Sequence, residues 1–188
     1  VHYYDASRRD KDQLFAFKQD PELGSALPDA VCAVIIVKEA GQKDKLLLFY
    51  EYRYPAGSYL LGLPAGLIDP ADLVSPDPIK TAMIREIKEE TGLSIGEKDT
   101  VEVINPLVFT ASGFSDESNA IVKAVIHVDD LSALNHKGAE GTEVFGDFKL
   151  VDKEEARRLL KEGRDDYGHY LPLVAWAALC YFVSDLWK

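Results

Sequence analysis

The amino-acid sequence predicts an α+β protein in which helices sandwich a mixed β-sheet. Runs rich in aliphatic and β-branched residues, which are typical of strands, occupy 31–37, 45–50, 101–108 and 120–128. Helix-spaced or continuously apolar segments occupy 78–91, 153–161 and 171–187. Strand-like and helix-like segments do not alternate regularly, as they would in a doubly wound parallel sheet. We therefore expect strands of both directions.

The 188 residues are enough for one domain, or for one domain with an extension. Residues 1–29 are polar with scattered aromatic side chains. We predict that they form an N-terminal extension holding one or two strands, which could pair across a dimer. Residues 30–188 are predicted to form the main domain.

The first strands of that domain are expected at 31–37 and 45–50, paired across the turn-like sequence EAGQKD. A short strand is predicted at 58–63 and ends before Pro64. The stretch 64–78 is dense in Pro, Gly and Asp, so we expect a loop there.

A helix is predicted at 78–91. Pro78 fits its first turn and Gly92 lies just past its end, as is common for helix termini. Met83 and Ile87 mark an apolar face four residues apart. Further along the chain, Asp152 and Glu155 resemble a capping pair for the helix at 153–161, and 171–187 reads as a second, apolar helix.

An excess of acidic residues narrows the range of partners. The chain has 21 Lys and Arg against 32 Asp and Glu, a formal net charge of −11. Such a surface repels phosphate backbones and anionic lipids, so we expect no nucleic-acid partner and no membrane partner. A small phosphorylated ligand stays compatible, because a divalent cation can neutralise the charge of a local site.

The cysteines and the apolar segments predict the compartment. Cys32 and Cys180 each lie in an apolar run, and no CxxC or Cys/His cluster indicates zinc or a disulfide. The polar start resembles no signal peptide, and the apolar stretch 171–183 falls short of the roughly 20 residues of a membrane span. We therefore expect a cytoplasmic protein.

Three glutamates of the predicted helix at 78–91 are the main indication of chemistry. Glu86, Glu89 and Glu90 are three and four residues apart, so their carboxylates share one helix face. Unpaired, they would repel one another, whereas a hard cation such as Mg²⁺ prefers carboxylate oxygens. Arg85 lies four residues before Glu89 and is predicted to hold that carboxylate. A solvated acidic face is the alternative.

The sequence around these glutamates resembles a known family. REIKEETGL, at 85–93, matches the second half of the Nudix box, G-x5-E-x7-R-E-U-x-E-E-x-G-U. LPAGLID, at 63–69, and EYRYPAG, at 51–57, resemble motifs of its ADP-ribose pyrophosphatase branch. The resemblance implies a Nudix-type α/β/α sandwich with a mixed β-sheet and a loop–helix–loop catalytic motif. It also implies a homodimer.

The activity implied by the resemblance is metal-dependent hydrolysis of the pyrophosphate bond of a nucleoside diphosphate linked to another group. ADP-ribose, giving AMP and ribose 5-phosphate, is the best guess, with Mg²⁺ as cofactor and Mn²⁺ as an alternative. A nucleotide sugar such as UDP-glucose or GDP-mannose is a second possibility. A weakened domain that senses such a ligand is a third, and a purely structural domain would leave the glutamates unexplained.

The resemblance also assigns roles. Glu86 and Glu90 resemble direct metal ligands, Glu89 a ligand or a contact to metal-held water, and the carbonyl of Ala65 a further ligand. Arg85 resembles the residue that orients them. Catalysis needs a group that takes a proton from water, and we predict Glu117 for this role, with Asp116 second and Glu89 as a rival.

The substrate pocket is predicted from aromatic and basic side chains. Arg53 ends a predicted strand, where a guanidinium could meet a phosphate bidentately. Tyr54 and Phe114 could stack on a base, although a core or interface role is as compatible with each.

One part of the box departs from the family pattern. Counting forward from Gly66 places the box Glu at Asp72, whereas counting back from Arg85 places it at Asp77, so the loop carries an insertion. We interpret Asp72 as a turn residue and leave both interpretations open for Asp77. Gly62 stands where this branch often has Glu, which weakens the substrate prediction.

Overall fold

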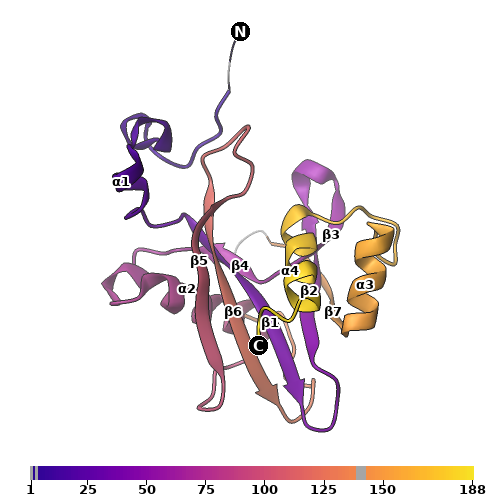
Figure 1. Cartoon of the computed structure of the whole chain (residues 1–188). Helices are drawn as coiled ribbons and strands as arrows, with labels where there is room; N and C mark the ends of the chain where they lie inside the picture. Colours follow the sequence, from indigo (N-terminus) through magenta and orange to yellow (C-terminus); the bar gives the residue numbers. More distant parts are fainter. Residues whose placement is uncertain (1, 3, 139–142) are drawn as a thin grey trace.

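The computed structural model describes residues 2, 4–138 and 143–188 (Figure 1). The described residues form one seven-stranded sheet whose main path runs β3-β2-β1-β6-β5, with β4 paired to β1 and β7 paired to β2. The strands are β1 (Ala30–Glu39), β2 (Lys45–Arg53), β3 (Ser58–Gly62), β4 (Ala65–Leu67), β5 (Thr100–Phe109), β6 (Ser118–Val128) and β7 (Phe145–Val151). The helices are α1 (Asp20–Leu23), α2 (Pro78–Thr91), α3 (Lys153–Glu162) and α4 (Leu173–Val183).

The sheet is mixed, as predicted. β1 pairs with β6 in parallel over ten residue pairs, from Ala30↔Asn119 to Glu39↔Val128. The other strand pairs are antiparallel. Figure 1 shows α2 on one face of this sheet and α3 with α4 on the other. The α+β class with a mixed sheet is therefore confirmed.

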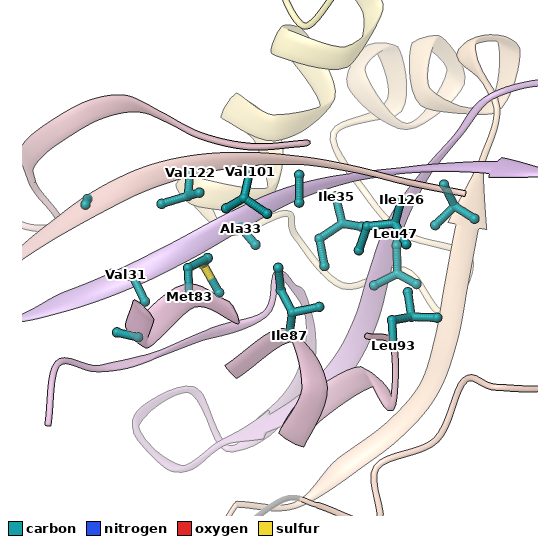
Figure 2. Packing of buried hydrophobic residues seen from close by; sticks show 14 residues of the cluster. Val31, Ala33, Ile35, Leu47, Met83, Ile87, Leu93, Val101, Val122 and Ile126 are labelled. Atoms are coloured by element: carbon teal, nitrogen blue, oxygen red, sulfur yellow. The ribbon is translucent and has the colours of Figure 1, made fainter. Parts of the chain in front are cut away.

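The central strand β1 feeds two cores, because its side chains alternate between the faces of the sheet. Val31, Ala33 and Ile35 pack against Met83 and Ile87 of α2 (Figure 2). Val34 and Ile36 instead join the cluster beneath α3 and α4. A strand buried on both sides explains why VCAVIIV is continuously apolar.

The predicted strands in residues 1–29 are not found in the described part of this segment. It forms single turns at Lys11–Gln13 and Phe15–Phe17 and the short helix α1. Side chains hold it in place: the Arg9 guanidinium lies 2.6 Å from Asp29 Oδ1 and 3.4 Å from Asp116 Oδ1, and it stacks 3.8 Å over the Phe15 ring. A segment fixed by side chains needs no strand pairing.

Other boundaries also differ from the sequence prediction. β4 lies inside the predicted loop 64–78 and pairs only three residues with β1. β7 was not predicted, since FGDFKLV breaks the apolar pattern with Gly146 and Asp147. α4 starts two residues later than predicted and ends at Val183, because Pro172 caps its first turn and Asp185 adopts a left-handed backbone.

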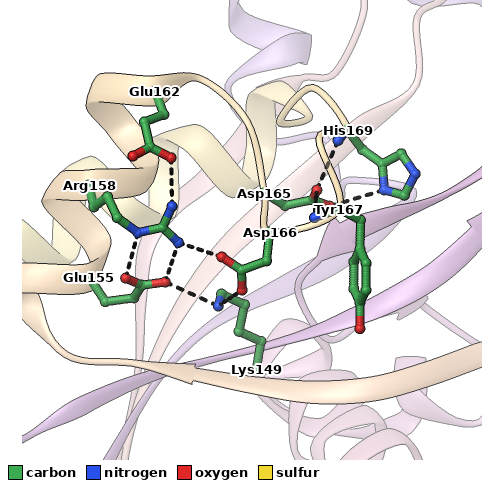
Figure 3. Close-up of polar contacts among 8 residues, drawn as sticks. All are labelled: Lys149, Glu155, Arg158, Glu162, Asp165, Asp166, Tyr167 and His169. Carbon is green, nitrogen blue, oxygen red and sulfur yellow. Dashed lines mark hydrogen bonds and ion pairs between the residues drawn. The ribbon is translucent and has the colours of Figure 1, made fainter.

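An ion-pair network fixes α3 to the sheet (Figure 3). We call it the α3 network: Lys149, Glu155, Arg158, Glu162 and Asp166. Arg158 contacts all three carboxylates of the network, and Lys149 of β7 contacts Glu155 and Asp166.

Within the described part of the chain, none of the helices has the length and apolar character that a membrane span requires.

Candidate metal-binding catalytic site

The helix α2 presents its glutamates to one side because its ends and its apolar face are fixed. Asp77 is the N-cap and accepts a hydrogen bond from the Lys80 amide at 3.1 Å. Gly92 closes the helix at φ 74°, a left-handed conformation that glycine adopts without strain. Met83 and Ile87 are fully buried in the core, and Glu86 and Glu90, each three residues after one of them, are buried beside this apolar face.

Arg85 lies at the centre of the contacts on the side of α2 that carries the glutamates. Its Nη1 donates to Glu86 Oε1 at 2.7 Å and to Glu89 Oε2 at 3.1 Å, which confirms the predicted pairing with Glu89. Its Nη2 donates to Asp72 Oδ2 and to the Leu67 carbonyl, each at 3.0 Å. Arg85 therefore ties the glutamates of α2 to the loop before it.

The contacts of Arg85 correct the interpretation of Asp72. Asp72 is buried and accepts a hydrogen bond from the Asp69 amide at 2.9 Å as well as from Arg85, so it is more than a turn residue. Asp77 takes the N-cap role instead. Of the two counts that disagreed, the forward one, from Gly66, gives the residue that contacts Arg85.

Glu90 is the most buried carboxylate of the site, with 3% of its surface exposed. Its Oε2 accepts a hydrogen bond from the Ala65 amide at 3.0 Å. Burial raises the pKa of Glu90 to about 9, and the nearby charges of Glu143, Glu86 and Glu51 act in the same direction. Burial of the ionised Glu90 carboxylate therefore costs free energy, and a bound cation would offset that cost.

Gly66 lets Glu86 approach the β4 strand. A Cβ atom on Gly66 would lie 2.0 Å from Glu86 Oε1, which excludes any side chain there. Burial also raises the pKa of Glu86, against the opposing charge of Arg85. The glycine of the LPAGLID motif is therefore needed for close approach of the loop to the helix carboxylate.

Two further carboxylates, not predicted from the sequence, belong to the same group. Glu51 on β2 is buried, and burial and the charge of Glu143 raise its pKa, although Arg53 lies 2.6 Å away. Glu143 precedes β7, and its pKa is raised first by burial. We call Glu51, Glu86, Glu89, Glu90 and Glu143 the carboxylate cluster. Glu51 lies 35 residues before Glu86 and Glu143 lies 53 residues after Glu90, so only the fold brings these two to the glutamates of α2.

The carboxylate cluster carries more negative charge than Arg85 and Arg53 can balance. Hard divalent cations are the usual partners of such a group, since they take several carboxylate oxygens at once. Among the described residues, however, no three carboxylates already stand in a metal-binding arrangement. Glu86 and Glu89 point to Arg85, and Glu90 to the Ala65 amide. The donor set fits a divalent cation once these side chains rotate.

The other predicted residues lie apart from these contacts. Glu117 Oε1 lies 3.7 Å from Arg8 Nε, and Asp116 accepts from the Phe15 amide at 3.2 Å, so both loop carboxylates contact the N-terminal segment. Arg53 pairs with Glu51 and is half exposed. Tyr54 and Phe114 are exposed, with Tyr54 against Tyr52.

Two hollows of the surface lie elsewhere. One of about 410 Å³ is lined by Gly92, His127 and Asp130, and one of about 380 Å³ by Tyr50, Tyr59 and Tyr167. Neither includes a member of the carboxylate cluster. Charge, burial and hydrogen bonds define the candidate site, not a cavity.

The candidate site is thus a loop–helix–loop that gathers carboxylates beside a mixed sheet. The family description NUDIX domain matches residues 26–174, so the chain belongs to the NUDIX domain family. The Nudix fold predicted from the sequence is confirmed.

Known relatives support the same family. The chain is 31% identical to an ADP-sugar pyrophosphatase of Mus musculus over 68% of this chain and 54% of that protein. It is 42% identical to an ADP-ribose pyrophosphatase of Mycobacterium tuberculosis over 61% of this chain and 50% of that protein. The chain spans about half the length of these relatives. A solved Ap4A hydrolase of C. elegans shares the fold, with a TM-score of 0.52 and 21% identity over 84% of this chain and 97% of that one.

Proposed function

We propose that this chain hydrolyses the pyrophosphate bond of a nucleoside diphosphate linked to a sugar, with ADP-ribose as the first substrate to test. The observation that carries this proposal is the carboxylate cluster, in which buried glutamates outnumber the cations that could balance them. A diphosphate is anionic and could not approach such a group alone. A substrate that arrives with divalent cations satisfies both charges.

The chain's residues have distinct roles in this proposal. Glu86, Glu89 and Glu90, with the carbonyl of Ala65, would hold Mg²⁺ or Mn²⁺. When bound, such a cation would polarise the phosphoryl oxygens and lower the pKa of a bound water. Arg85 would keep Glu86 and Glu89 in place through the contacts it already makes. Arg53, half exposed at the end of β2, would meet a phosphate oxygen.

The group that takes the proton from water has two candidates. Glu117 is the residue predicted from the sequence. It contacts Arg8, and its side chain is partly exposed. Glu143 has the better support, because its charge acts on Glu86, Glu90 and Glu51 and its own pKa is raised. A raised pKa brings a carboxylate nearer to the value that suits a base at neutral pH.

The finer predictions on assembly and compartment rest on separate features. Exposed apolar side chains at the start of α4, Leu173, Val174 and Trp176, support the proposed homodimer. The free thiols of Cys32 and Cys180 support a reducing compartment, and we propose the cytoplasm.

A substrate panel tests the proposed reaction. ADP-ribose, UDP-glucose, GDP-mannose and Ap4A are each incubated with the protein and Mg²⁺, and products are separated by ion-exchange chromatography. We expect AMP and ribose 5-phosphate from ADP-ribose and no turnover after addition of EDTA. Faster turnover of the nucleotide sugars or of Ap4A would contradict ADP-ribose as the preferred substrate. Binding of ADP-ribose without turnover in Mg²⁺ or Mn²⁺ would favour a sensing domain.

Two isosteric variants separate the candidate bases. Glu143→Gln and Glu117→Gln each remove one carboxylate with little change in shape, and kcat is measured from pH 6 to 10. If Glu143 is the base, its variant loses at least about 100-fold in kcat, within the usual contribution of a general base. Glu117→Gln then stays near wild type. The reverse result would restore Glu117 as the base.

A further inference from the structure

Residues Asn135–Gly138 run along the C-terminal turn of α2, behind the glutamates of the carboxylate cluster. We call them the buttress segment. The Asn135 amide donates to the Thr91 carbonyl at 3.0 Å, and His136 Nδ1 lies 2.5 Å from the Glu90 carbonyl. A Cβ on Gly138 would lie 2.8 Å from Glu89 Cα, so only glycine fits this close approach. The segment therefore follows the helix residue by residue.

These contacts satisfy helix carbonyls that have no partner within the helix. The last four carbonyls of a helix need partners from elsewhere. The Gly92 amide donates to the Lys88 carbonyl, and the Asn135 amide donates to the Thr91 carbonyl. His136 Nδ1 contacts the Glu90 carbonyl. The backbone of Glu90 is thus fixed by a side chain from another part of the chain.

His136 also reaches the opposite wall of the site. Its Nε2 lies 3.1 Å from the carbonyl of Gly146 on β7. β7 pairs with β2, where Phe145 lies opposite Glu51. One imidazole ring therefore joins the helix that carries Glu90 to the strand pair that carries Glu51.

The ring is held flat between aromatic side chains. Phe148 stacks on it at 4.0 Å between ring centres and Phe145 at 4.8 Å, with Phe49 edge-on at 5.4 Å. Both ring nitrogens lie within hydrogen-bond distance of a carbonyl oxygen, and the tautomer decides which nitrogen donates. The stacked rings and the two contacts of the ring nitrogens fix the orientation of the imidazole.

We infer that His136 is a positioning residue of the metal site, which fixes the separation of the two walls that carry Glu90 and Glu51. The inference rests on the proposed function, in which these carboxylates surround divalent cations. Metal sites need their ligands held to within about 0.5 Å by a supporting shell. Loss of an outer-shell partner typically lowers metal affinity by about 10- to 100-fold.

Three substitutions separate the contributions of the ring. His136→Phe keeps the aromatic stack and removes both contacts of the ring nitrogens. His136→Asn places an amide donor where Nδ1 was, toward Glu90, and His136→Gln places one where Nε2 was, toward Gly146. Binding of Mn²⁺ to the whole chain without substrate is followed by the electron paramagnetic resonance signal of free Mn²⁺.

We expect His136→Phe to weaken Mn²⁺ binding at least fivefold and to lower kcat about tenfold, with KM for the diphosphate within threefold. The Asn and Gln variants, each keeping one bond, should fall between it and wild type. Mn²⁺ affinity within twofold of wild type in His136→Phe overturns the inference. If that variant does not fold, the Asn and Gln variants decide: unchanged affinity in both overturns the inference, and a fivefold loss in either supports it.

Two controls exclude a general loss of stability. Phe182→Leu weakens the core beneath α4, far from α2 in the fold, and should lower the melting temperature without changing Mn²⁺ affinity. His127→Phe makes the same exchange at an exposed histidine paired with Asp99 and should change neither. A wild-type chain that binds Mn²⁺ but hydrolyses no diphosphate would contradict the proposed function alone, because the Mn²⁺ series tests His136 without turnover.

Discussion

The carboxylate cluster beside α2 and the α3 network are built from the same residue types, yet several carboxyl groups in the one have a raised pKa and several in the other a lowered pKa. In the α3 network, hydrogen bonds from Arg158 lower the pKa of Glu155, and those from Lys149 lower that of Asp166. In the carboxylate cluster, burial raises the pKa of Glu51, Glu86 and Glu143.

The difference comes from how each region balances its charge. The α3 network places a cation against every carboxylate at a partly exposed surface (Figure 3). The carboxylate cluster buries more anions than its two arginines can pair, which is costly without a further cation. Charge that is balanced within the chain holds a structure together, whereas buried charge left unbalanced marks a place where a ligand completes the structure.

The largest expected effect comes from neutralising the most buried member of the cluster. Glu90→Gln should lower kcat/KM at least about 100-fold, since loss of an outer-shell partner already reaches the 10- to 100-fold range. The metal-free protein should stay folded, because an amide needs no counter-charge. Steady-state kinetics with Mg²⁺ measures the loss. Glu155→Gln, the same exchange in the α3 network, is the control, and equal activity of the two variants would erase the contrast between the regions.

An intermediate effect is expected at Asp72, which stands where the Nudix box has Glu. Asp72→Asn removes an anionic partner of Arg85, so kcat/KM should fall about tenfold, at the low end for an outer-shell residue. Asp77→Asn should stay near wild type in activity and stability, because asparagine caps a helix as well as aspartate. Kinetics and thermal melts of both variants check this. Equal losses of kcat/KM in the two variants would indicate that Asp72 is only a turn residue.

The pH dependence of stability should show the unbalanced charge directly. The folded pKa of Glu90 is about 9, above its ordinary value of 4.5. Between these values the folded state binds more protons than the unfolded state, so stability falls as pH rises. Metal-free wild type should lose several degrees of melting temperature from pH 5 to pH 9 relative to Glu90→Gln. Added Mg²⁺ should reduce the difference. Parallel melting curves for the two proteins without metal would contradict the raised pKa.

The smallest effect is expected in the balanced region. Arg158→Ala breaks three ion pairs, but its side chain is 37% exposed, and surface pairs contribute about 1 kcal/mol or less. Urea unfolding should therefore show a loss near that size, with unchanged kcat. A loss of more than about 2 kcal/mol, or any loss of activity, would show that the α3 network supports the site.

The sequence was sufficient wherever the information is local. Pro78, Gly92 and the spacing of Met83 and Ile87 predicted α2 to the residue, and the pairing of Arg85 with Glu89 followed from their separation of four. The paired strands around the EAGQKD turn were predicted for the same reason. Where contacts are distant, prediction failed: β7 has a broken apolar pattern, and residues 1–29 are held by Arg9 and not by strands.

What the sequence by itself determined is a helix with three glutamates on one face, because helical periodicity is set by the backbone. Which other groups surround that face was decided only by the tertiary structure. Glu51 lies on β2, Asp72 between β4 and α2, and His136 and Glu143 between β6 and β7, with no shared spacing. Their electrostatic effect depends on distance through space and on burial, and neither is encoded in separation along the chain.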